Sequence, residues 1–273
     1  MINQSFHLHL ISDATGETAI AIARAACAQF EGVRVVEHLW SLVRNETQLV
    51  RILGSIEANP GVVFYSIVDT DLRRILDEGC QALDVPTVAL LDPAITALRK
   101  YLGVESANQP GGQHVMDADY MKRIDSMNFA LAHDDGQGAS SLAGADVVLV
   151  GVSRTSKTPT CFYLANRGLK AANIPVVPGC PLPEELMSLS GPLVVGLTRS
   201  ADQLVDIRRN RLRLLGQEDG TDYVDPETVD NEVREARRLF SRQGWMALDV
   251  SRRSIEETAA AILQLYGKHT GEL

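Results

Sequence analysis

The sequence has few cysteines, no long apolar run and no excess of basic residues. Its four cysteines are widely scattered and form no CxxC pair, which favours neither a disulfide framework nor a zinc site. No segment reaches the roughly 18 consecutive apolar residues of a membrane helix, and the first ten residues lack a charged stretch followed by a long apolar run. We therefore expect a cytoplasmic protein without a membrane partner.

Acidic residues outnumber basic ones in this chain of 273 residues. There are 35 Asp and Glu against 26 Lys and Arg, which gives a formal net charge of -9. That balance offers no broad basic surface for a polynucleotide or for anionic lipid, so we expect no nucleic-acid partner. The length permits one large or two small domains with a substantial core, as an enzyme needs.

Short β-branched and aliphatic runs alternate with longer stretches of helical period. This alternation predicts an α/β fold in which a mostly parallel sheet is covered by helices. The expected strands are 6–12, 33–40, 61–68, 85–91, 146–152, 174–177, 193–198 and 245–250, and helices are expected at 15–30, 46–58, 70–83 and 116–133. Pro and paired Gly between Ser106 and His114 predict a mobile loop. We place a domain boundary near Gly138, between an N-terminal α/β domain (1–138) and a second α/β domain (139–273).

The strongest local pattern is an apolar strand that leads through a polar loop into a helix. Residues 151–158 read GVSRTSKT and match the phosphate-loop pattern GxxxxGK[ST], except that Ser156 replaces the second glycine. Backbone N–H groups of such a turn, aided by the helix dipole, can surround an anion. The predicted nucleotide-binding residues are Gly151, Val152, Ser153, Arg154, Thr155, Ser156, Lys157 and Thr158.

With this loop, we interpret residues 139–273 as a kinase-like α/β domain with a phosphate loop that binds a nucleotide. Three side chains of the loop have predicted roles in phosphoryl transfer. Lys157 would place a full positive charge between the β- and γ-phosphates, and the Thr158 hydroxyl would reach Mg²⁺. Arg154 can add a planar donor to a phosphate or to charge that develops during transfer. The alternative is an ordinary connection whose Ser and Thr cap the helix and whose Lys is solvated, although capping would not require two cations in the turn.

Phosphoryl transfer also needs a group that orients the attacking hydroxyl, usually a carboxylate. Asp13 closes the first predicted strand, at the end where parallel sheets hold ligands; its alternative role is a helix N-cap. Asp134 and Asp135 follow a predicted helix and could face the same cleft, or form a solvated helix end. We select Asp13 as the catalytic base, together with Lys157 and Arg154 as catalytic residues.

A basic stretch, 207–215, lies in a further predicted helix. Arg208 and Arg211 share one face of that helix. They could bind a phosphate or an acidic partner, although a solvated helical face is the commoner explanation.

Several segments together are more specific than the loop alone. They are HLISDATGETA near the start, VFYSIVD at 63–69, IDSMNFALAHDDG, GVSRTSKTPT with YLANRGLKAANIPVVPG, and GLTRS from Gly196. With these segments, almost the whole chain resembles the bifunctional regulatory proteins of pyruvate, phosphate dikinase and of phosphoenolpyruvate synthase. The resemblance implies an ADP-dependent serine/threonine kinase that phosphorylates a threonine beside the catalytic phosphohistidine of its target. It also implies the reverse process, in which inorganic phosphate removes the group and pyrophosphate is released.

The resemblance is closer to the dikinase branch, because Thr155 and Ser156 stand where the synthase branch usually reads Cys-Gly. It places ADP on Gly151 to Thr158 and leaves the base open. The expected target is therefore pyruvate, phosphate dikinase, with ADP as donor, inorganic phosphate as co-substrate and Mg²⁺; a homodimer is one assembly open to the chain. Alternatives are the same chemistry on the synthase, a non-catalytic ADP-sensing inhibitor, a small-metabolite kinase and a dinucleotide-dependent oxidoreductase. The oxidoreductase is disfavoured, because this sequence has no GxGxxG motif after the first predicted strand.

Overall fold

The computed structural model describes residues 4–112, 118–216 and 222–271. The chain divides into two compact units, Met1–Val115 and Met116–Leu273, and each unit contains a four-stranded sheet in which all strands are parallel. The predicted α/β class is therefore confirmed.

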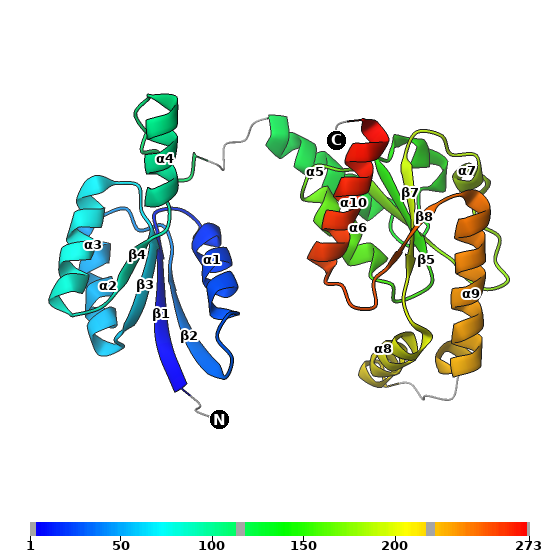
Figure 1. Cartoon of the computed structure of the whole chain (residues 1–273), viewed down its shortest axis with the longest axis horizontal. Helices are drawn as coiled ribbons and strands as arrows, with labels where there is room; N and C mark the ends of the chain where they lie inside the picture. Colours follow the sequence, from blue (N-terminus) through cyan, green and yellow to red (C-terminus); the bar gives the residue numbers. More distant parts are fainter. Residues whose placement is uncertain (1–3, 113–117, 217–221, 272–273) are drawn as a thin grey trace. The chain divides into compact units, whose positions relative to one another are not determined.

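In unit 1 the sheet has the strand order β2-β1-β3-β4. The strands are β1 (Gln4–Ser12), β2 (Val33–Trp40), β3 (Gly61–Ser66) and β4 (Thr87–Ala89), and the helices are α1 (Glu17–Cys27), α2 (Glu46–Ala58), α3 (Thr70–Ala82) and α4 (Asp92–Leu102). Helix α1 covers one face of the sheet, and α2 and α3 cover the other (Figure 1). Successive residues of β1 serve opposite faces: Leu10 packs with α1, whereas Ile11 packs with α2 and α3.

In unit 2 the strand order is β6-β5-β7-β8. The strands are β5 (Val147–Gly151), β6 (Ala171–Pro175), β7 (Leu193–Thr198) and β8 (Met246–Asp249); the helices are α5 (Ala118–Ala132), α6 (Lys157–Ala165), α7 (Glu184–Met187), α8 (Ala201–Leu214), α9 (Pro226–Gln243) and α10 (Ile255–Thr270), with 3-10 turns η2 (Ala139–Gly144) and η3 (Asp222–Val224). All five residues of β5 are buried, as expected for a central strand covered on both faces.

Two apolar cores lie on the two faces of this second sheet. Val148 of β5 packs with α8 and α9, whereas Leu149 packs with α6 and α10. Gly196 of β7 permits α9 to approach, since an added Cβ would lie 2.4 Å from the Phe240 ring.

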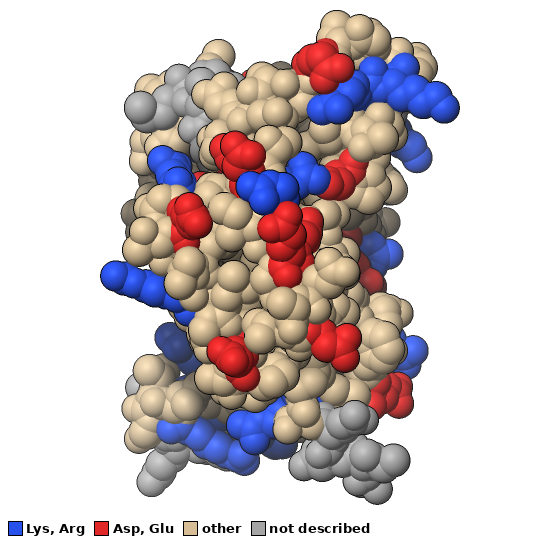
Figure 2. Space-filling model, turned by 90° about the vertical axis from the view of Figure 1, so that its left-hand side faces the viewer, with Lys and Arg blue, Asp and Glu red and all other residues tan. Residues whose placement is uncertain are grey.

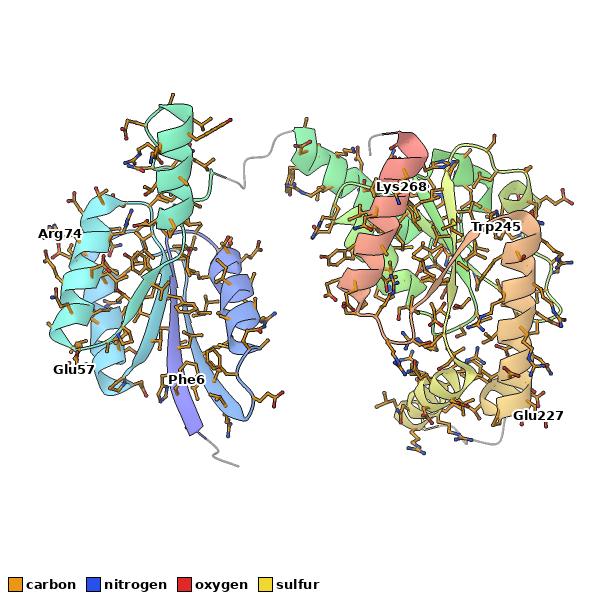
Figure 3. All side chains as sticks on the ribbon, viewed as in Figure 1. Phe6, Glu57, Arg74, Glu227, Trp245 and Lys268 are labelled. Carbon is orange, nitrogen blue, oxygen red and sulfur yellow. The ribbon has the colours of Figure 1, made fainter. Side chains whose placement is uncertain are left out.

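The outer surfaces of both units carry charged side chains. Arg74 lies on the solvent side of α3 in unit 1, and Lys268 lies on the solvent side of α10 in unit 2 (Figure 3). On the face drawn in Figure 2, acidic and basic side chains are interspersed.

The division between the units differs from the predicted boundary near Gly138. Helix α5 packs against α6 and β6, so it belongs to unit 2, and the division falls before this helix. Sequence periodicity identified the helix, but it could not show which sheet the helix covers.

Other differences from the predicted elements are local. Asp92 and Pro93 begin helix α4, which the sequence analysis did not predict. Residues 106–109 have no helix or strand, whereas residues 113 and 114 of the predicted mobile loop lie outside the described residues. Within the described ranges, no helix combines the length and apolar character needed to cross a membrane.

Candidate functional site

The loop 151–158 lies at the carboxyl end of β5, the strand between β6 and β7. Its last two residues, Lys157 and Thr158, form the start of helix α6. The loop is therefore at the edge of a parallel sheet where ligands bind in α/β proteins, beside a helix N-terminus. This placement agrees with the predicted order of strand, loop and helix.

The backbone of the loop accounts for the residues at the two glycine positions of the pattern, Gly151 and Ser156. A Cβ added to Gly151 would lie 2.6 Å from the Leu197 carbonyl oxygen, so the strand packs closely only with glycine there. Ser156 has a φ of 63° and Arg154 a φ of 72°, in the left-handed region that favours glycine. Ser156 therefore keeps the backbone that the second glycine of the pattern would adopt, at a cost of about 1–2 kcal/mol.

Lys157 lies inside the loop rather than in solvent. Its side chain is 6% exposed, and its Nζ donates to the Val152 carbonyl oxygen at 3.1 Å. Burial lowers the pKa of Lys157 to about 8, although the Asp135 and Asp134 carboxylates oppose the shift. The Thr155 hydroxyl donates to the same carbonyl oxygen at 2.9 Å. The predicted alternative of a solvated lysine is therefore wrong.

The Asp134–Asp135 pair lies against the first turn of α6. The Thr158 hydroxyl donates to Asp134 Oδ1 at 2.9 Å, and the Asn173 amide donates to the same oxygen. The backbone N–H of Asp135 donates to Asn173 Oδ1 at 3.2 Å. Asp134 is thus fixed by partners from α6 and β6, so the solvated helix end considered for the pair is wrong for Asp134, whereas Asp135 is exposed.

These side chains fit a magnesium ion in their donor chemistry. The Thr158 hydroxyl and the Asp134 carboxylate are hard oxygen donors, and Mg²⁺ is usually held by one or two carboxylates together with substrate phosphates. No group of three or more His, Cys, Asp or Glu side chains suited to a metal occurs within the described residues. The Thr158 hydroxyl and the Asp134 carboxylate could hold Mg²⁺ together with a phosphate ligand.

A cavity of about 360 Å³ is lined in part by the loop 151–158. Its lining comprises Asp135, Ser153, Arg154, Ser156, Lys157, Thr158, Pro159, Pro175, Arg199 and Ile207. Three cationic side chains, those of Arg154, Lys157 and Arg199, thus line one cavity next to a helix N-terminus. We call it the cradle cavity. Such pooled positive charge can bind a di- or polyphosphate and stabilise charge on a transferring phosphoryl group.

Arg199 had no predicted role, although it lies in the GLTRS segment. It follows β7, the neighbour of β5, and donates from Nη2 to Ser156 Oγ at 3.2 Å. Its Nε is buried without a hydrogen-bond partner among the described residues. Burial lowers the pKa of Arg199, and Asp249 opposes that shift. The sequence signal for Arg199 was a cation directly after the predicted strand 193–198, but the sequence could not show that this strand pairs with β5.

Arg208 differs from the expected solvated face. Its side chain is 1% exposed and forms a 2.7 Å ion pair with Glu232, whereas Arg211 is exposed. Arg208 also donates to the Tyr223 carbonyl oxygen at 3.0 Å and to the Ser153 carbonyl oxygen at 3.4 Å. Arg208 thus contacts the loop through the Ser153 carbonyl oxygen. The expectation of a solvated helical face is therefore wrong for Arg208.

Asp13 lies in unit 1, at the end of β1. It is 3% exposed, and its Oδ2 accepts from the Val68 backbone N–H at 2.7 Å. Burial raises the pKa of Asp13, and the Val68 hydrogen bond opposes the shift. In this described part of the chain, the N-cap of α1 is Gly16 without a side-chain cap, so the N-cap alternative for Asp13 is wrong. The loop belongs to unit 2, and the role of Asp13 as catalytic base stays a prediction.

The family model and the relatives found by sequence agree with one another. A family model described as kinase/pyrophosphorylase matches residues 8–263. A relative from Paramagnetospirillum magneticum that carries the name pyruvate, phosphate dikinase regulatory protein is 55% identical over 266 residues, covering 97% of this chain and 86% of that protein. One from Hyphomonas neptunium with the same name is 56% identical over 268 residues, covering 97% and 96%. Among solved structures, a LacI transcriptional regulator from Lactobacillus brevis covers 90% of this chain and 98% of its own at 12% identity and a TM-score of 0.22, which is too low to inform on the fold.

Proposed function

The chain belongs to the kinase/pyrophosphorylase family, and from this premise we propose that it regulates pyruvate, phosphate dikinase by reversible phosphorylation. In one direction the β-phosphoryl group of ADP passes to a threonine hydroxyl of the target, leaving AMP. In the other, inorganic phosphate attacks the phosphothreonine, which regenerates the hydroxyl and releases pyrophosphate. The names of the relatives support the dikinase as the target.

The observation that carries this proposal is the cradle cavity. Arg154, Lys157 and Arg199 line it together with the N-terminus of α6. Phosphoryl transfer passes through a loose transition state with charge spread over the phosphoryl oxygens, and its catalysis consists mainly of positioning and electrostatic stabilisation. A cavity with three cations supplies both.

The same cradle cavity serves both reactions, because in each reaction a phosphate group lies next to the phosphoryl group that is transferred. In phosphorylation the cradle holds the diphosphate of ADP; in the reverse reaction it holds free phosphate beside the phosphothreonine. Burial lowers the pKa of Lys157 to about 8, and an anion bound beside it would raise that pKa again because it favours the charged form.

Thr158 and Asp134 would hold Mg²⁺ in this proposal. The ion would neutralise charge on the phosphates when bound. Asn173 and the Thr158 hydroxyl keep the Asp134 carboxylate at the first turn of α6, so this acceptor is positioned before substrate enters. Asp135 lines the cradle cavity and can accept a hydrogen bond there.

The test is transfer of label from ADP labelled at the β-phosphate to the phosphohistidine-bearing dikinase. We expect label on a target threonine, release of labelled pyrophosphate after addition of phosphate, and loss of both reactions in Lys157→Ala. Lys170→Ala, which removes an exposed lysine outside the cavity, is the matched control and should retain both reactions.

Three outcomes would contradict the proposal in different ways. Binding of ADP without label on threonine would indicate a non-catalytic sensor. Label on phosphoenolpyruvate synthase instead of the dikinase would change the target. Retention of either activity in Lys157→Ala would show that the two reactions use separate sites.

A further inference from the structure

A second cavity lies directly beside the cradle cavity in unit 2. It has a volume of about 440 Å³, and Ser153 and Pro175 line both cavities. Its remaining lining residues are Val176, Val177, Pro178, Arg208, Asp222, Tyr223, Thr228 and Glu232. The volume is in the range of pockets that bind small ligands, about 300–1,000 Å³. A group attached to a phosphate in the cradle could therefore continue into this space.

The two walls of the second cavity differ in chemistry. One wall is the apolar segment 175–178, which follows β6. The other is formed by η3 and the start of α9 and presents Tyr223, Thr228 and Glu232. An apolar lining with a few placed polar groups is typical of pockets that bind small organic ligands, because the apolar part excludes water and the polar groups fix orientation.

The polar wall is held in place by buried contacts. Arg208, 1% exposed, pairs with Glu232 at 2.7 Å, and its guanidinium lies 4.6 Å from the centre of the Tyr223 ring. The Tyr223 hydroxyl lies 3.1 Å from Ser153 Oγ. Since the side chain of Glu232 is 11% exposed, a carboxylate is kept at the cavity wall with one partner already fixed. Its second oxygen can accept from a ligand.

We propose that this second cavity holds the nucleoside of the nucleotide whose diphosphate lies in the cradle cavity. We call it the nucleoside pocket. The heterocycle lies against Val176 and Pro178, and Glu232 accepts a hydrogen bond from a hydroxyl or amino group of the nucleoside. The assignment rests on the proposed function, since it requires a nucleoside diphosphate in the cradle.

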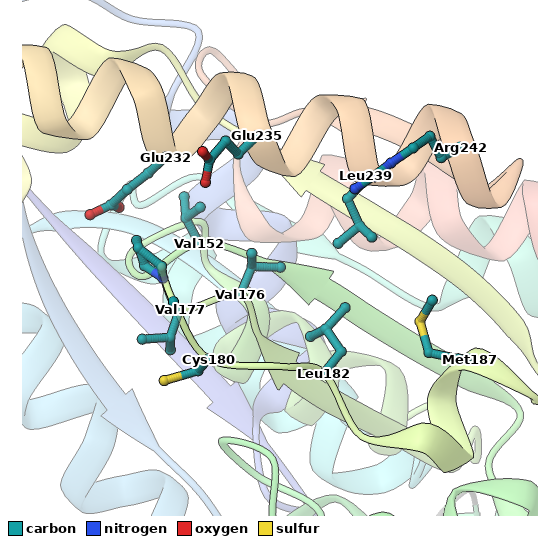
Figure 4. Close-up of a pocket in the computed structure, with 12 residues that line it drawn as sticks. Val152, Val176, Val177, Cys180, Leu182, Met187, Glu232, Glu235, Leu239 and Arg242 are labelled. Carbon is teal, nitrogen blue, oxygen red and sulfur yellow. The ribbon is translucent and has the colours of Figure 1, made fainter.

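A third cavity extends from the nucleoside pocket along α9 and is the competing place for the nucleoside. Figure 4 shows Val176 and Val177 facing Glu232 and Glu235 of α9 there, with Met187 at the far end. This cavity shares Val176, Val177, Pro178 and Glu232 with the nucleoside pocket, but its lining has no residue in common with that of the cradle cavity. The diphosphate therefore connects more directly to the nucleoside pocket.

The test compares a ligand that has a nucleoside with one that lacks it. Thr228→Trp fills the nucleoside pocket with an indole. We expect ADP to bind this variant at least tenfold more weakly, measured by calorimetry, whereas inorganic pyrophosphate binds unchanged. Met187→Trp, in the third cavity, is the matched control and should bind both as the wild type does. Lys157→Ala should weaken both ligands, because it acts on the phosphates.

The outcomes separate this proposal from the proposed function. Unchanged ADP affinity in Thr228→Trp, or equal weakening of ADP and pyrophosphate, overturns the nucleoside pocket. Weaker ADP binding in Met187→Trp moves the nucleoside to the third cavity and also overturns it. Unchanged ADP affinity in Lys157→Ala contradicts the phosphate cradle itself. Should Thr228→Trp not fold, Asp222→Trp replaces it, since Asp222 is exposed and lines the nucleoside pocket but not the third cavity.

Discussion

Replacing Lys157 by methionine should stabilise the fold while it removes function. The ammonium group is buried, and the fall of the Lys157 pKa from 10.5 to about 8 corresponds to about 3 kcal/mol against the charged form. Methionine keeps the apolar stem and removes the charge. Loss of the hydrogen bond to Val152 costs about 1 kcal/mol. We therefore expect Lys157→Met to be about 2 kcal/mol more stable than the wild type at neutral pH.

The stability advantage of Lys157→Met over the wild type should become smaller as the pH rises. Below the folded-state pKa of about 8, folded and unfolded chains both carry the proton, so the full cost of burying charge is present. Between about 8 and 10.5 the unfolded chain binds more protons than the folded chain, so the stability of the wild type rises with pH. The advantage of the variant should accordingly disappear as the pH approaches 10.5.

Urea unfolding of the full chain at about pH 7 and about pH 10 measures both quantities, and the labelled-ADP assay measures function. Transfer should fall by at least about 10²-fold, the usual effect of removing one group that stabilises transition-state charge. A variant that is less stable than the wild type at neutral pH, with a difference that does not change with pH, would refute the argument from burial. Full transfer activity would refute the assignment of Lys157 to the cradle.

Three further predictions concern single residues of the same unit. Ser156→Gly should raise the melting temperature, since relief of the left-handed strain of about 1–2 kcal/mol exceeds the loss of the hydrogen bond to Arg199; a lower melting temperature contradicts this. Arg199→Ala should lower the rate of label transfer about 10²–10³-fold with an unchanged melting temperature, and an unchanged rate would exclude Arg199 from the cradle. Arg208→Ala should lower the free energy of unfolding by about 3–5 kcal/mol, because it leaves the Glu232 carboxylate, whose side chain is only 11% exposed, without its cation. In the same urea experiment, Arg211→Ala, at an exposed position, should change it by no more than about 0.5 kcal/mol, and equal effects of the two variants would contradict the role of the ion pair.

The sequence by itself determined many of the helices and strands and the strand-loop-helix order around residues 151–158, although it missed helix α4. Hydrophobic period and β-branched runs predicted β2, α2 and β7 with their observed bounds, because these patterns depend on neighbours within a few residues. The GVSRTSKT segment likewise predicted a strand, a loop and a helix start, since the anion-binding geometry of such a turn is local. The departure from the pattern at Ser156 is also a local matter, because Ser156 itself adopts the left-handed backbone conformation.

Only the tertiary structure decided which distant residues complete the site. Arg199 reaches the loop because β7 pairs with β5, and Asn173 reaches Asp134 because β6 is the other neighbour of β5. Strand order is set by how whole helices and strands pack, so no single segment records it. The same reason places α5 in unit 2 and buries Arg208 against Glu232, where sequence period alone had indicated a solvated face.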